Sequence, residues 1–157
     1  MRSLTITTQP VSEPLTLAQA KLYLRVDGTD DDTLIEDLLI PAARGAVESF
    51  TRRSLLPTAW SYKIDEFPSV IRLPVGPVLA AADVVITYVD TDGVVQTLAA
   101  ADYQVTLGDN ILLRPAYGKS WPTPRYELEA VRIAFTAGYA TAADVPTGLI
   151  VTMELLI

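Results

Sequence analysis

The sequence predicts an α+β fold, in which a small helical bundle carries an inserted antiparallel β-meander or small β-sandwich. Apolar residues recur with helical spacing before Pro57, alternate with polar residues in short segments after it, and return to helical spacing near the end. With 157 residues, half of them hydrophobic, the chain suits one domain, or one small domain with an elaborate insertion. We expect an N-terminal arm (1–13), a helical hairpin (14–54), an antiparallel β insertion (55–145) and the start of a C-terminal helix (146–157).

A capping box predicts the first helix. Thr16 and Gln19 stand three residues apart, so each side chain can satisfy a backbone N–H group that the first helical turn leaves free. A short helix from Leu17 to Arg25 should follow, and the turn at 27–29 should end it. We expect this helix to form a tight antiparallel pair with the next one.

The second helix should begin at the carboxylates of residues 30–32, which favour the positive end of the helix dipole. On the solvent side we expect Glu36, Asp37, Arg44, Glu48 and Arg52. Pro41 should kink the helix because proline lacks a backbone donor. Two adjoining apolar rows predict a wide buried stripe, namely Leu34, Leu38, Ala42, Ala46 and Phe50 beside Ile35, Leu39, Ala43 and Val47.

The facing of this helix has a measurable consequence. If Phe50 is a core residue, Phe50→Ala should cost about 3–5 kcal/mol of the free energy of unfolding. If Glu48 faces the solvent, Glu48→Ala should cost less than about 0.5 kcal/mol.

Alternating segments after Pro57 predict about six short strands. Val84 to Val89 is rich in β-branched residues, and Thr91-Asp92-Gly93 supplies the hairpin turn that follows it. Leu128 to Thr136 alternates cleanly, with its apolar side chains on one face. Weaker alternation marks the other strands, at Trp60 to Ile64, Ile71 to Leu73, Tyr103 to Leu107 and Ile111 to Leu113.

Pro146 is suited to the first position of the C-terminal helix, because its fixed φ is helical and its missing donor would be unpaired there. Apolar residues at three- and four-residue spacing then form one stripe. This stripe can dock on a partner or pack on the two preceding helices, and the sequence leaves both open. The stripe consists of Leu149, Ile150, Met153, Leu156 and Ile157.

Composition removes several classes of function. The chain has no cysteine and no histidine, so thiol nucleophiles, imidazole bases and the commonest zinc ligands are absent. The net charge is −7 with no basic stripe, which argues against specific nucleic-acid binding. The first ten residues lack the apolar segment of a signal peptide, and no stretch is long enough to span a membrane. We therefore expect a soluble intracellular product.

Three motifs resemble chemical sites but lack the partners that such sites need. Gly118-Lys119-Ser120 resembles the end of a phosphate-binding loop, yet Leu113 stands where that loop requires glycine. The acidic run 27–32 does not place glycine and glutamate as a calcium loop does. Glu127 and Glu129 should share one face of a strand, but nothing in the sequence supplies a partner that would shift either pKa. We expect no catalytic, cofactor-binding or metal site.

Eight short motifs in fixed order resemble the head-to-tail connector (adaptor, head-completion) family of tailed phages, prophages and gene transfer agents. The match spans nearly the whole chain. The motifs are Pro-Leu-Thr-Leu-Ala-Gln-Ala-Lys (14–21), Asp-Asp (31–32), Glu-Ser-Phe-Thr-Arg-Arg (48–53), Leu-Pro-Val-Gly-Pro-Val (73–78), Tyr-Val-Asp-Thr-Asp-Gly (88–93), Trp-Pro (121–122), Phe-Thr-Ala-Gly-Tyr (135–139) and Val-Pro (145–146).

This resemblance implies a structural role without enzymatic activity. Copies would form a ring, dodecameric on the portal protein, in the virion neck after DNA packaging, and a downstream stopper or tail-completion protein would dock on it. The protein would be made in the host cytoplasm, and packaged DNA would pass through the ring. The residues expected to meet the portal or a neighbouring copy are the C-terminal stripe and Trp121. The alternative for Trp121 is a buried position in the core. Alternatives are another tail-associated interaction module or a carboxylate-based hydrolase.

Overall fold

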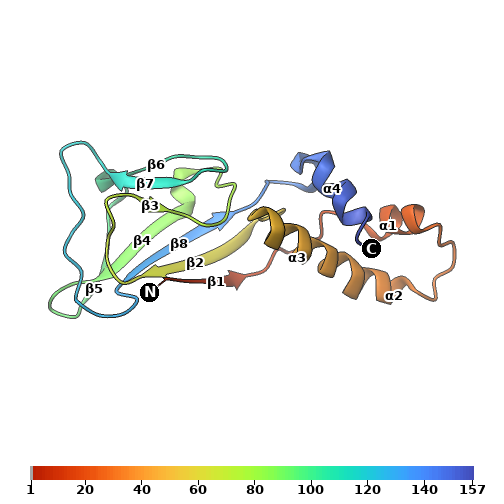
Figure 1. The fold of residues 1–157 in the computed structure, drawn as a ribbon, viewed down its shortest axis with the longest axis horizontal. Helices are drawn as coiled ribbons and strands as arrows, with labels where there is room; N and C mark the ends of the chain where they lie inside the picture. The colour runs from red at the N-terminus through yellow and green to blue at the C-terminus, as the bar shows by residue number, and fades with distance from the viewer. Residues whose placement is uncertain (1) are drawn as a thin grey trace.

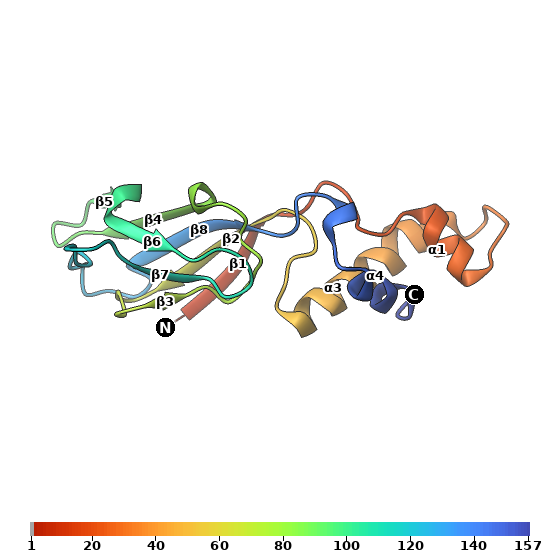
Figure 2. The ribbon, with the colours of Figure 1, turned by 90° about the horizontal axis from the view of Figure 1, so that it is seen from above.

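The computed structural model describes residues 2–157 and has the predicted α+β class (Figure 1). The molecule is elongated, with the strands gathered at one end and the helices at the other (Figures 1 and 2). Each end has its own cluster of buried apolar side chains. Between residues 2 and 157, no helix is both long and apolar enough to cross a bilayer.

The β end contains two antiparallel sheets. Five strands pair in the order β1-β2-β8-β4-β5, and three pair in the order β3-β7-β6. The structure thus adds strands to the expected six and arranges them as a small sandwich. The strands are β1 (Arg2–Thr8), β2 (Thr58–Ile64), β3 (Ile71–Arg72), β4 (Val84–Val89), β5 (Val95–Thr97), β6 (Tyr103–Val105), β7 (Leu112–Pro115) and β8 (Val131–Ala137).

Strand β8 lies at the centre of the larger sheet, between β2 and β4. Its alternating residues Val131, Ile133 and Phe135 are buried, as their spacing predicted. The turn after β4 also follows prediction, because Gly93 adopts a φ of +84° there. Side chains from both sheets meet over β8 and form the core of the β end.

Strand β1 was not predicted, since residues 1–13 were expected to be an arm. Residues 2–8 pair with β2 over its whole length, with Leu4 opposite Tyr62. The Ser3 hydroxyl donates to Glu129 at 2.7 Å, and Lys63 forms an ion pair with the same carboxylate. These two groups hold the pKa of Glu129 below its ordinary value. The arm therefore becomes the edge of the sheet.

The helical end contains four α-helices: α1 (Leu17–Leu24), α2 (Asp32–Leu34), α3 (Ile40–Thr51) and α4 (Thr147–Glu154). The capping box of α1 is present, because the Gln19 N–H donates to the Thr16 hydroxyl and the Gln19 side chain accepts from the Thr16 backbone. Lys21 links α1 to α2 through an ion pair with Asp32. Pro146 caps α4 and is not itself helical.

A π-helical turn, Ile35–Leu39, joins α2 to α3 without a break. It stands directly before Pro41, where a regular helix would bring the proline ring against a preceding carbonyl group. In a π turn, one extra residue enters the helix, so the residues after it are rotated relative to those before it. The effect of Pro41 is thus seen as a change in the facing of the helix.

Two connecting segments cross where the helical end meets the β end. The segment after α3 passes the segment after β8, and at the crossing Gly138 touches the backbone of Leu56 and Pro57. A Cβ atom on Gly138 would lie 2.2 Å from the Leu56 carbonyl oxygen. Gly138 also has a φ of +133°, which other residues rarely adopt.

Gly138→Ala should therefore lower the free energy of unfolding by about 3 kcal/mol or more, through backbone strain and overlap with a neighbouring strand connection. Gly148→Ala in α4 is the matched control, because a Cβ there meets nothing within 4 Å. The control should be neutral or stabilising by up to about 1 kcal/mol. Urea unfolding of both variants measures the difference, and equal midpoints would contradict the close crossing.

Candidate interaction surface

One side of the continuous helix α2–α3 carries an exposed apolar row. The row was predicted to be core, and that prediction is wrong: Phe50 is 92% exposed, and the other members are exposed as well. No other part of residues 2–157 covers this surface. We call it the α3 row, and it consists of Leu34, Leu38, Ala42, Ala46 and Phe50.

The second predicted row does face the core. Ile35, Ala43 and Val47 are buried, and Leu39 is partly buried. The π turn adds Ile40 to this buried set, five residues after Ile35. The extra residue in that turn rotates the buried stripe about the helix axis. A strict four-residue repeat of apolar residues therefore predicts a wider buried face than the helix has.

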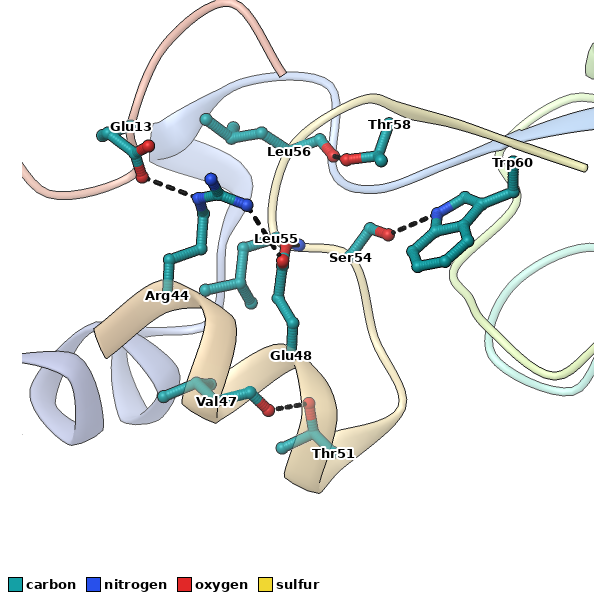
Figure 3. A network of polar contacts seen from close by, with 10 residues as sticks. All are labelled: Glu13, Arg44, Val47, Glu48, Thr51, Ser54, Leu55, Leu56, Thr58 and Trp60. Carbon is teal, nitrogen blue, oxygen red and sulfur yellow. Dashed lines mark hydrogen bonds and ion pairs between the residues drawn. The ribbon is translucent and has the colours of Figure 1, made fainter. Parts of the chain in front are cut away.

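Glu48 explains how α3 is oriented on the rest of the chain. It was expected on the solvent side, but its side chain is largely buried at the junction of the two ends (Figure 3). One carboxylate oxygen accepts from the Leu55 backbone N–H at 2.7 Å, and the other accepts from Arg44 at 3.0 Å. Arg44 also donates to Glu13 at 2.7 Å. Because Glu48 faces the interior, the α3 row on another side of the helix faces the solvent.

Burial acts on the charges of this network. It raises the pKa of Glu48 above its ordinary value, because desolvation outweighs the Leu55 N–H and Arg44. Burial alone would lower the pKa of Arg44, but Glu13 and Glu48 together raise it. Arg44 is therefore charged throughout the physiological range, and one guanidinium holds two carboxylates.

Three further hydrogen bonds lie where the helical end meets the β end. The Trp60 indole N–H in β2 donates to the Ser54 hydroxyl at 2.9 Å (Figure 3). Arg53 donates to Tyr139 at 2.8 Å and to Asp109 at 2.6 Å. These contacts hold α3 close to the β end, and they shape a groove between β1 and α3.

This groove has a volume of about 550 Å³. Ile6 of β1 lies on one wall, Gly45 and Ser49 of α3 lie on the other, and Trp60 and Val75 contribute apolar surface. We call it the β1/α3 groove. It borders a different side of α3 from the α3 row.

The C-terminal stripe packs mainly on its own chain. Met153 is fully buried in the helical core, and Leu149, Ile150 and Ile157 pack against that core. The expectation that Met153 faces a partner is thus wrong for the free chain, because α4 lies against α3. Leu156 is the member of the stripe that is exposed, and Val151 and Leu155 are exposed beside it.

Trp121 packs against the β core, which agrees with the core alternative and not with the interface alternative. Its ring stacks on Phe67 with centroids 5.0 Å apart, and Phe67 meets Tyr88 edge to face. The indole N–H is buried without a hydrogen-bond partner in the described part of the chain. Nearby exposed side chains, Tyr117, Tyr126 and Leu128, lie in the loop between β7 and β8.

The carboxylates considered for chemistry are paired with cations. Glu129 meets Lys63, and Glu127 lies 3.5 Å from Arg125. Within residues 2–157, no three acidic side chains converge as a metal site would require. Both carboxylates thus take part in ion pairs.

A family model and several solved structures show what the chain is similar to. A family model described as phage gp6-like head-tail connector protein matches residues 14–108. No curated protein matches the sequence. Among solved structures, a chain in the neck of an empty gene transfer agent particle computed with C6 symmetry is 23% identical with a TM-score of 0.79, covering 98% of this chain and 80% of that one.

Two related particles give similar matches. A chain in the virion of a native gene transfer agent particle is 25% identical with a TM-score of 0.77, covering 98% of this chain and 80% of that chain. A chain in the neck of a native particle computed with C12 symmetry is 20% identical with a TM-score of 0.66, covering 97% and 80%. The fold is shared along almost the whole chain.

The chain belongs to the phage gp6-like head-tail connector family. This confirms the resemblance drawn from the eight sequence motifs. The protein is thus a structural connector and not an enzyme.

The structure reverses the two expectations for α3. Phe50→Ala should change the free energy of unfolding by less than about 0.5 kcal/mol, because the ring touches solvent. Glu48→Ala should cost about 1–3 kcal/mol, because it leaves the Leu55 N–H without an acceptor and removes one of the two carboxylates that Arg44 contacts. Thermal and urea unfolding of the two variants measure this order. A larger loss of stability for Phe50→Ala than for Glu48→Ala would support the facing of α3 predicted from the sequence.

Proposed function

We propose that copies of this chain form a ring in the neck of a tailed-phage or gene transfer agent particle, between the portal and downstream tail proteins. The observation that carries this is the α3 row, an apolar surface with the aromatic ring of Phe50 fully open to solvent. Monomeric proteins rarely leave such a surface uncovered. The C6 and C12 symmetries of the particles with similar chains support a ring of copies.

The two ends of the molecule suit different partners. At the helical end, we assign the portal to the outer side of α4, where Val151, Leu155 and Leu156 are exposed. At the far end of the β sandwich, the exposed Tyr117 and Tyr126 suit a stopper or tail-completion protein, because exposed aromatic residues are frequent anchors in interfaces. The loop that carries them is distant from the helices (Figure 1).

The net charge of the chain determines how we expect the isolated protein to associate. With a net charge of −7, copies repel one another at low concentration, and packaged DNA can pass through the ring without being gripped. We expect a monomer or weak oligomer in sedimentation at micromolar concentration, and rings in electron micrographs once the portal of the same particle is added. Absence of rings on the portal would refute the proposed function.

Portal docking has its own test. Leu155→Asp combined with Leu156→Asp should weaken binding to the portal at least tenfold, because charge replaces exposed apolar surface. The melting temperature should change little, since neither side chain is buried. Leu128→Asp at the far end of the β sandwich is the matched control and should bind the portal normally. Equal portal binding by the original protein, the double variant and the control would refute the assignment of the portal to α4.

A further inference from the structure

A closed ring of identical copies needs two different surfaces on each copy, because every subunit presents one surface to the copy before it and another to the copy after it. The two surfaces must be complementary and must lie on different sides of the molecule. This inference rests on the proposed ring and asks which surfaces of the chain meet.

The first surface is the α3 row. Phe50 closes the row at the last turn of α3, and the small residues Ala42 and Ala46 precede it. An aromatic side chain that is 92% exposed, next to small neighbours, projects as a knob. Buried aromatic anchors of this type carry much of the binding energy in protein interfaces.

The second surface is the β1/α3 groove. Its volume of about 550 Å³ exceeds what one aromatic ring requires, since an apolar cavity of roughly 150 Å³ holds benzene. Trp60 and Val75 give it apolar lining, and Arg44, Glu48, Arg52 and Arg53 give it charged lining. The groove is thus large enough for a phenyl ring, which can pack on the apolar side chains and lie against an arginine.

Gly45 points independently to a neighbour at this groove. It stands in the interior of α3, where glycine stabilises a helix less than alanine does. No atom of its own chain would meet a Cβ there within 4 Å, so nothing inside the molecule requires its small size. Close approach of another chain would require it.

The positions of the two surfaces exclude an intramolecular solution. The positions Gly45 and Ser49 precede Ala46 and Phe50 by one residue each, which separates the two sets by about 100° around the helix. Phe50 therefore points away from the groove of its own chain. We propose that Phe50 of one copy inserts into the β1/α3 groove of the next copy, and that this contact repeats around the ring.

Engineered disulfides test the contact directly, because the chain has no cysteine of its own. The double variant Ile6→Cys with Phe50→Cys should give, on oxidation, a ladder of covalent oligomers that ends at the number of copies in the ring. Each single variant can form dimers at most. Phe50→Cys with Thr123→Cys, whose second site lies in the exposed loop before β8, is the matched control and should not form a ladder.

A blocking variant supplies the second test. Gly45→Leu should melt at or above the temperature of the original protein, because the site is open and leucine favours helix. The same variant should weaken assembly at least tenfold, because the leucine side chain fills the groove. Thr123→Leu, at an exposed loop site outside both surfaces, should leave assembly unchanged.

The outcomes separate this contact from the ring itself. Rings on the portal without a ladder, or normal assembly of Gly45→Leu, would overturn the Phe50 contact and leave the proposed function standing. No rings of the original protein and no ladder of the double variant, both in the presence of portal, would overturn both. A ladder together with a block by Gly45→Leu would establish the contact.

Discussion

The rotation of α3 about its own axis decides which surface this protein offers to its neighbours. A single carboxylate has a large part in fixing that rotation, since Glu48 lies at the junction of the two ends and satisfies both the Leu55 N–H and Arg44. Arg44 and Glu48 lie on α3 and move together, so turning α3 to bury Phe50 would take Glu48 away from the Leu55 N–H and Arg44 away from Glu13. A polar group left unpaired inside a protein costs free energy. A polar constraint at the junction thus determines where the apolar contact surface lies.

The sequence predicts the strands and the capped first helix well, because their signals are local. Alternation identified β8, and Thr16 with Gln19 identified the start of α1. The facing of α3 could not be predicted in this way. A π turn leaves no pattern of its own in the sequence, and helical spacing alone does not show that Glu48 accepts from the Leu55 N–H beyond the end of α3. Pro41 was the one local sign that the regular helix is disturbed.

Two other misjudgements have a common physical cause. Strand β1 was missed because residues 2–8 become a strand only by pairing with β2, which lies about fifty residues away. Met153 was assigned to a partner because the sequence does not tell which surface covers an apolar stripe. Family resemblance gave the function without these details, since a connector can be recognised from ordered motifs while its contact surfaces depend on packing.

The place of β8 in the larger sheet has a consequence for synthesis and folding. This strand lies between β2 and β4, yet it is the last of the eight described strands to leave the ribosome. Until residue 137 has emerged, β2 and β4 each keep one open edge, and such edges can pair with other chains. The contacts that close the sheet join distant parts of the sequence, which makes folding slow. During much of its synthesis, a nascent connector therefore holds the β1-β2 and β4-β5 parts of the larger sheet without the central strand that joins them.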